Sequence, residues 1–304
     1  VMGYCNMIWR LIAETKTDSL AVIFDTASKT FRNEIYKEYK ANRSEAPEDL
    51  VPQFSLIREA TKAFNIPYIE LAGYEADDII ATYASQASSE GWKVDIISSD
   101  KDLMQLVNDN VKMIDPMKMI TIDKEQVFKK FGVYPDRVID VQALAGDSTD
   151  NIPGVPGIGI KTAAELINHY GDLESLLTRA HEIKQPKRKE NLVNFADLAR
   201  ISMKLVTLSD DVKEIENFKK FKRQDIDLNK LKTFLLEQGF NSLIGRLPNE
   251  DGFIESKSAY VALQQDKEET QSKIDIDINY KLITEENDLI NWVTGIYLKG
   301  FVVV

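Results

Sequence analysis

Two short runs rich in β-branched and aliphatic residues decide the fold class: Leu20-Ala-Val-Ile-Phe24 and Lys93-Val-Asp-Ile-Ile97. Apolar residues recur at helical spacing between these runs, so the sequence predicts βαβ units and an α/β fold with a mainly parallel central sheet flanked by helices. Asp25 follows the first run directly, and Asp100 follows the second after two serines. Because ligands bind at the carboxyl ends of strands in open α/β sheets, both aspartates occupy positions typical of a functional site.

Helices are expected around this sheet wherever the apolar period approaches 3.6 residues. The predicted helices are Val1 to Ile12, Pro52 to Phe64, Glu75 to Glu90, Asp123 to Phe131, Pro135 to Leu144 and Asp225 to Gln238. The third of these ends at Gly91, a residue type that suits a helix C-terminus. A glycine-rich stretch beginning at Gly154 opens a compact helical region that extends to about Leu208.

Length and composition predict more than one domain. The chain has 304 residues, of which 43% are hydrophobic, and this is enough to bury a substantial core. We expect an α/β core over residues 1–130, a helical subdomain over 131–247, a polar linker over 248–274 and the start of another domain over 275–304. Cys5 is the single cysteine, which excludes an internal disulfide and favours a reducing cytoplasm. No apolar run is long enough to span a membrane.

Acidic residues at the boundaries of these elements give the clearest functional signal. They are Asp25, Glu75, Asp77, Asp78, Asp100, Asp102, Asp147 and Asp150. Clustered carboxylates repel one another and stay ionised together only when cations lie among them. Oxygen ligands without nearby histidine or cysteine suit Mg²⁺ or Mn²⁺ rather than zinc. Each pair alone is more often a solvated helix cap than a metal ligand, but their recurrence at element ends favours a shared metal site. The net charge of -11 therefore does not exclude a phosphodiesterase.

A basic and aromatic segment, Thr30 to Arg43, follows the Asp25 strand. Lys37, Lys40 and Arg43 are three residues apart, so on a helix they would form one cationic row that could hold a phosphate. Phe31, Tyr36 and Tyr39 offer rings for stacking on bases. The alternative is an amphipathic helix with a solvated basic face.

These stretches resemble the 5′-nuclease (flap endonuclease-like) family, most closely the 5′ to 3′ exonuclease domains that begin bacterial polymerases of the DNA polymerase I type. The resemblance covers about residues 1–247 and rests on the following motifs: Val22-Ile-Phe-Asp25, Phe31-Arg32, Tyr39-Lys-Ala-Asn-Arg43, Gly73-Tyr-Glu-Ala-Asp-Asp78, Ser99-Asp-Lys-Asp-Leu103, and Gly146-Asp-Ser-Thr-Asp-Asn-Ile-Pro-Gly-Val-Pro-Gly-Ile-Gly-Ile-Lys-Thr-Ala163. It implies a PIN-like core, a helical arch and a C-terminal helix-hairpin-helix subdomain.

The resemblance also implies roles for individual residues. All eight acids above correspond to metal ligands, for two Mg²⁺ or Mn²⁺ ions. Lys40 and Arg43 correspond to catalytic arch residues, and Phe31, Arg32 and Tyr39 to substrate contacts. The helix-hairpin-helix turn would bind duplex phosphates, with K⁺ as a possible companion ion, through Gly154, Gly157, Gly159, Lys161 and Thr162. Its alternative is a plain tight turn between helices.

The implied reaction is two-metal hydrolysis of DNA that leaves a 5′-phosphate and a 3′-hydroxyl. The implied substrates are 5′ ends, flaps and nicks in DNA and RNA primers in hybrids, handled by a monomeric, nucleoid-associated bacterial protein. The family begins with a further aspartate-bearing strand that precedes Val1, so the alternative is a catalytically impaired fragment that binds DNA in a structure-specific way. The stretch Phe301-Val-Val-Val304 resembles the first strand of a 3′ to 5′ exonuclease-like domain. A phosphatase built on Asp25 is disfavoured because Thr26-Ala27 lacks the required second acid.

Overall fold

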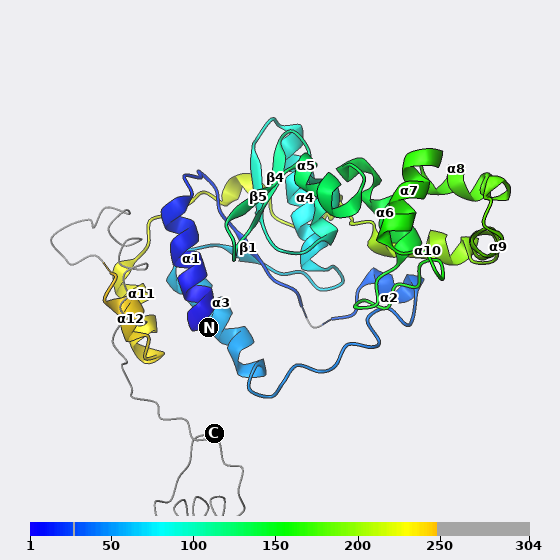
Figure 1. Cartoon of the computed structure of the whole chain (residues 1–304). Coiled ribbons are helices and arrows are strands. Elements are labelled where there is room, and N and C mark those ends of the chain that lie inside the picture. Colours follow the sequence, from blue (N-terminus) through cyan, green and yellow to red (C-terminus); the bar gives the residue numbers. More distant parts are fainter. Residues whose placement is uncertain (27, 248–304) are drawn as a thin grey trace, which may run out of the picture. The chain divides into compact units, whose positions relative to one another are not determined.

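The computed structural model describes residues 1–26 and 28–247, and Val1–Leu247 forms one compact unit. The predictions of a linker over 248–274 and of a further domain over 275–304 lie outside the described residues. Figure 1 shows strands and α4 at the centre of this unit, with α6–α10 beside them. The α/β class that the sequence predicts is confirmed.

The strands form two small sheets in the described part of the chain. In the first, β1 (Val22–Ile23) pairs in parallel with β2 (Tyr68–Ile69). In the second, β3 (Val94–Ile97) pairs in parallel with β4 (Val111–Asp115), and β5 (Ile120–Ile122) lies antiparallel to β4. Both predicted runs therefore become parallel strands, each followed by an aspartate at its carboxyl end.

Helices α3 and α4 pack near the strands because their apolar residues recur on one face. Helix α4 (Ala76–Ser89) follows the N-cap residue Glu75, and Gly91 adopts a φ of 84° just after its end. Helix α1 (Met2–Glu14), α3 (Val51–Ala63), α11 (Leu228–Glu237) and α12 (Asn241–Ile244) share a core. Cys5, Phe64 and Leu235 belong to this core, which ties the first and last described helices together.

A larger core joins the three-stranded sheet to the helical region. The elements around it are η1 (Asp102–Leu106), α5 (Lys124–Phe131), η2 (Pro135–Arg137), α6 (Val138–Ala145), α7 (Ile160–Tyr170), α8 (Leu173–Thr178), η3 (Ala180–Glu182), α9 (Pro186–Asn194) and α10 (Ala196–Val206). The short η4 (Phe218–Lys220) belongs to a separate small cluster with Ala87 and Phe221. Met113 of the sheet and Leu144, Ile167 and Leu192 of the helices are fully buried in one cluster. The helical region is thus fixed rigidly against the strands.

The segment from Thr30 to Leu50, which we call the arch segment, is less helical than the sequence suggests. Only α2 (Phe31–Ile35) forms, and residues 36–50 run as turns and an extended connection to α3 (Figure 1). Lys40 adopts a φ of 57°, and its backbone N–H donates to the carbonyl of Asp150 at 2.9 Å. The prediction of one helical row of Lys37, Lys40 and Arg43 is therefore wrong, because a tertiary hydrogen bond holds the backbone in a left-handed turn.

A candidate metal centre and its basic rim

Six of the eight predicted acids line a single cavity of about 120 Å³. They are Asp25, Glu75, Asp77, Asp100, Asp102 and Asp150, and the cationic side chains of Arg32, Lys40 and Arg43 line the same cavity. The acids come from separate elements: the end of β1, the start of α4, the segment after β3 and the loop after α6. Distant stretches of sequence therefore converge on one place, as the carboxylate pattern predicts.

Local backbone geometry aims each carboxylate at this cavity. The Asp25 carboxylate accepts a hydrogen bond of 2.8 Å from the N–H of Ala76, which links the end of β1 to the start of α4. The Asp100 carboxylate accepts one of 2.9 Å from the N–H of Asp102 and so holds a tight turn into η1. Asp77 lies in the first turn of α4, where unpaired helix N–H groups favour negative charge.

Four of the acids form an uncompensated negative group, which we call the acidic wall: Asp25, Asp77, Asp100 and Asp102. No ion pair to any of the four occurs in residues 1–26 and 28–247 within 4.0 Å. Burial and the charges of Asp100, Asp25 and Asp102 raise the pKa of Asp77 to about 8. Burial and the charge of Asp100 raise the pKa of Asp102 to about 6.

The acidic wall fits a divalent metal by its chemistry. Its donors are all carboxylate oxygens, which suit hard cations, and an added positive charge would relieve the repulsion that raises both pKa values. Within the described part of the chain, no three Asp, Glu, His or Cys side chains already form a closed ligand set. Mutual repulsion separates carboxylates that share no cation, so we assign the wall as a candidate centre, not a preformed cage.

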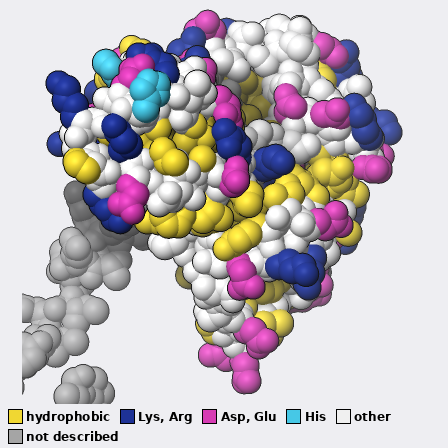
Figure 2. All heavy atoms as spheres, turned by 90° about the vertical axis from the view of Figure 1, so that its right-hand side faces the viewer, with side chains coloured by type: hydrophobic (Ala, Val, Ile, Leu, Met, Phe, Trp, Pro, Cys, Tyr) yellow, Lys and Arg dark blue, Asp and Glu magenta, His cyan; other side chains and the backbone are white. Residues whose placement is uncertain are grey.

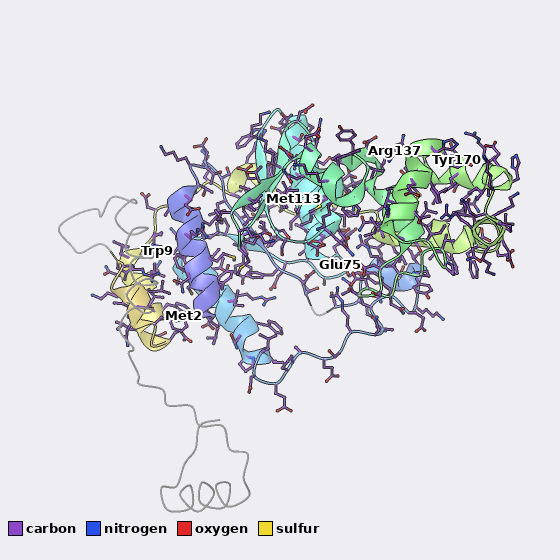
Figure 3. All side chains as sticks on the ribbon, viewed as in Figure 1. Met2, Trp9, Glu75, Met113, Arg137 and Tyr170 are labelled. Carbon is purple, nitrogen blue, oxygen red and sulfur yellow. The ribbon has the colours of Figure 1, made fainter. Side chains whose placement is uncertain are left out.

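The cavity lining also carries two cationic side chains, which we call the basic rim: Lys40 and Arg43. The Lys40 ammonium donates to Glu75 at 2.6 Å, and the Arg43 guanidinium pairs with Asp150. Figure 3 shows Glu75 between α4 and the segment that carries α2. The Arg43 side chain is half exposed, so part of the rim is open to solvent.

Two predicted substrate contacts, Arg32 and Tyr39, have structural partners within the protein. Arg32 is 1% exposed and donates to the carboxylate of Asp78 and to the carbonyls of Leu205 and Thr207. Tyr39 is buried, and its hydroxyl donates to Glu75 at 3.1 Å. Both side chains also line the carboxylate cavity. Their contacts hold the arch segment in place there, and their roles as substrate contacts stay predictions.

Asp78 also departs from its predicted role as a metal ligand. It is fully buried, and its two oxygens accept hydrogen bonds from Arg32 and from the N–H groups of Glu75 and Ser209. These four hydrogen bonds, two on each oxygen, occupy all of the acceptor sites of the carboxylate and leave none for a metal. Asp147 lies outside the cavity lining and pairs with Lys101.

Sequence reasoning missed one partner of the acidic wall. The side-chain amide of Gln142, in the middle of α6, donates to Asp102 and opposes the rise in its pKa. Gln142 is 4% exposed. A buried polar residue within an otherwise apolar helix is a signal that could have revealed it, because buried amides need hydrogen-bond partners.

The glycine-rich turn divides into a buried half and an exposed half. Gly154 is buried, with a φ of 59°, and a Cβ there would lie 2.5 Å from the backbone nitrogen of Gly146. Its N–H donates to the Ser202 hydroxyl at 2.9 Å. Gly154 therefore serves close backbone packing, and its contact with DNA stays a prediction.

The exposed half leads into α7. Gly157, Gly159 and Lys161 are exposed, and Thr162 follows them in the first turn of the helix. Free N–H groups at such a helix start suit an anion. Figure 2, which faces this side of the molecule, shows apolar side chains in a band with Lys and Arg side chains around it.

Comparisons with known families agree with this architecture. Residues 1–132 match the family described as 5′-3′ exonuclease, N-terminal resolvase-like domain, and residues 133–229 match the 5′-3′ exonuclease, C-terminal SAM fold. The chain therefore belongs to the 5′-3′ exonuclease family. It is 57% identical over 219 residues to DNA polymerase I of Rhizobium leguminosarum, covering 70% of this chain and 22% of that protein.

A second relative is similar over most of its own length. The 5′-3′ exonuclease of Aquifex aeolicus is 42% identical over 248 residues, covering 80% of this chain and 83% of that protein. The polymerase relatives are much longer: the chain spans 22% of the Rhizobium protein and 30% of DNA polymerase I from Bacillus caldotenax.

Solved structures share the fold. The T5 5′-exonuclease with bound divalent zinc ions has a TM-score of 0.62 and 26% identity, covering 68% of this chain and 80% of that chain. The bacteriophage T5 D15 flap endonuclease in complex with DNA and metal ions has a TM-score of 0.61 and 25% identity, with the same coverage. Among the described residues, no helix is long and apolar enough to cross a membrane.

Proposed function

We propose that this chain is a metal-dependent 5′ to 3′ exonuclease and flap endonuclease that hydrolyses phosphodiester bonds in DNA and RNA primers. The observation that carries this proposal is that the acidic wall, four carboxylates without an ion-pair partner, lines the same cavity as the basic rim. Hydrolysis of a phosphate ester needs both groups: basic side chains that bind the phosphate, and a metal centre that activates the attacking water. The metal-bound T5 relatives support the same reading.

The acidic wall would hold Mg²⁺ or Mn²⁺, and we propose two ions. When bound, such ions supply an activated water and neutralise charge on the leaving oxygen. Glu75, Asp147 and Asp150 already accept from Lys40, Lys101 and Arg43, so we place them at the edge of the centre. There they orient the cationic side chains until a phosphate enters.

The basic rim would bind the scissile phosphate. Lys40 and Arg43 can exchange their carboxylate partners for phosphate oxygens, because both reach the cavity and Arg43 is half exposed. The positive charges of these two side chains would stabilise the negative charge that develops on the phosphate during attack. The products would be a 5′-phosphate and a 3′-hydroxyl.

The exposed half of the glycine-rich turn would hold the duplex behind the cut. Its contacts are the backbone N–H groups of Gly157 and Gly159, the first turn of α7 and the Lys161 ammonium, with K⁺ as a possible bridging ion. Because the polymerase relatives are bacterial, we propose a cytoplasmic, nucleoid-associated protein. We further propose that this monomeric module works within a DNA polymerase I on primers, flaps and nicks.

A labelled flap substrate tests the proposal. The chain with Mg²⁺ should release short products, and EDTA should stop the release. Lys40→Ala and Arg43→Ala should each slow cleavage by roughly 10²-fold, whereas Lys37→Ala is the matched control on an exposed lysine of the same segment and should cleave normally. Retention of the flap without cleavage in Mg²⁺ and in Mn²⁺ would overturn the proposal in favour of a purely binding module.

A further inference from the structure

A larger hollow, which we call the aromatic groove, lies beside the carboxylate cavity. It encloses about 500 Å³ and lies between α2, the turn before α4 and the end of α10. Its lining includes Phe31, Ile35, Tyr74, Met203, Lys204 and Leu208. No role in the proposed chemistry accounts for Tyr74, Met203 or Lys204.

The aromatic groove and the carboxylate cavity are neighbours. Leu208 lines both of them. Phe31 of the groove directly precedes Arg32 of the cavity, and Tyr74 directly precedes Glu75. A chain molecule whose phosphate is held at the basic rim therefore has its next unit within reach of the groove.

The lining of the groove combines two aromatic rings, those of Phe31 and Tyr74, with one cationic side chain, that of Lys204. The ring centroids of Phe31 and Tyr74 are 6.0 Å apart and tilted by 58°, and the Arg32 guanidinium covers one side of the Phe31 ring at 4.6 Å. Among the described residues the Lys204 side chain makes no ion pair, and the Tyr74 hydroxyl makes no hydrogen bond. The groove thus offers ring faces, an uncommitted hydroxyl and an exposed ammonium group together.

We propose that the aromatic groove binds one unpaired nucleobase of the strand being cut, next to the scissile phosphate, with Lys204 on the adjoining phosphate. This inference rests on the proposed function for the position of the strand. A nucleobase matches the groove because it stacks on aromatic rings while its phosphate needs a cation. An apolar peptide would leave Lys204 and the Tyr74 hydroxyl without partners.

Stacking on ring faces tolerates any base, so the groove should require a base without selecting its identity. Removal of the Tyr74 ring should therefore weaken the binding only of substrates that carry a base at the stacked position. This pairing of a protein change with a DNA change separates a nucleobase contact from a general loss of structure.

Binding is measured first, on flaps with 2-aminopurine placed singly at positions around the flap junction. The chain is mixed with each flap in Ca²⁺, and strand integrity is checked on a gel. One position should lose fluorescence when the chain binds, and Tyr74→Leu should restore it. Tyr74→Phe, which keeps the ring, should quench as the original chain does. Quenching at no position, or equal quenching with Tyr74→Leu, would overturn the inference.

Kinetics in Mg²⁺ form the second test. Tyr74→Leu should raise KM by roughly ten-fold on an intact flap with little change in kcat. It should match the unaltered chain on a flap with an abasic site at the stacked position. An equal rise in KM on both flaps contradicts a base contact.

A substitution at an exposed position guards against misfolding of the Tyr74 variants. Lys204→Gln should reduce the slope of log binding constant against log salt concentration by about one, the value for one lost phosphate contact. An unchanged slope argues against a phosphate contact at the groove. Failure of the unaltered chain to cleave in Mg²⁺ would instead remove the proposed function, and the fluorescence results in Ca²⁺ would stand independently.

Discussion

The guanidinium of Arg32 donates two parallel hydrogen bonds, of 2.7 and 2.8 Å, to the carboxylate of Asp78. Both side chains are almost completely inaccessible to solvent. Arg32 also donates to the carbonyls of Leu205 and Thr207, so a single residue joins α2 and α4 to the end of α10. This contact holds the arch segment where Lys40 and Arg43 line the carboxylate cavity.

Replacement of Asp78 by Asn should destabilise the protein because Arg32 would keep a buried charge without a counter-ion. Loss of one partner of such a pair costs roughly 3–5 kcal/mol, measured by urea unfolding. Asp109→Asn is the control: it removes an exposed pair with Lys124 and should have no measurable effect. Folded Asp78→Asn should still bind Mg²⁺ with unchanged affinity, and a large loss of affinity at full folding would show that Asp78 is a ligand.

Divalent metal should stabilise the chain through the acidic wall. A metal that binds only the folded state adds about 2.7 kcal/mol when its concentration is a hundred times its Kd. We therefore expect Mg²⁺ to raise Tm, and Asp77→Asn to reduce that rise while raising the Tm of the metal-free protein, since a repelled charge is removed. NaCl at equal ionic strength controls for screening. An equal rise in Tm with Mg²⁺ in the unaltered protein and in Asp77→Asn would show that the ion binds away from the acidic wall.

The two ends of the glycine-rich turn should respond differently to alanine. Gly154→Ala places a methyl group against the backbone of Gly146 at a positive φ, and we expect a loss of about 3 kcal/mol in the free energy of unfolding. Gly159→Ala meets open space and ordinary backbone geometry, so its cost should stay within about 1 kcal/mol. Similar losses at both sites would refute the close approach of Gly146 and Gly154.

Cys5 should make the stability of the protein sensitive to alkaline pH. Burial raises the pKa of its thiol from 9.0 to about 11, so the folded state keeps a proton that the unfolded state releases. The stabilising effect is therefore complete below pH 9 and is lost as pH rises to about 11. Unfolding free energies of the unaltered protein and of Cys5→Ala, measured across this range, should converge as pH rises. A constant difference between them would contradict the shift.

Local signals predicted some elements closely. Helix α4 extends over Ala76–Ser89, as expected from the acids before it and Gly91 after it, because capping and helix periodicity act within a few residues. The short strands β2, β4 and β5 were not predicted. Strands of two to five residues carry too little periodicity to be distinguished from loops and form only by pairing with a neighbour.

The sequence by itself determined the chemistry of this protein: which carboxylates follow the strands, where two basic side chains lie between Asp25 and Glu75, and which glycines lead into α7. Only the tertiary structure decided how each group is used. Asp77 and Asp78 are adjacent in sequence, yet Asp77 faces like charges while Asp78 is neutralised by a guanidinium that comes from α2. Charge interactions depend on distance through space and on burial, and neither is encoded in the order of neighbouring residues.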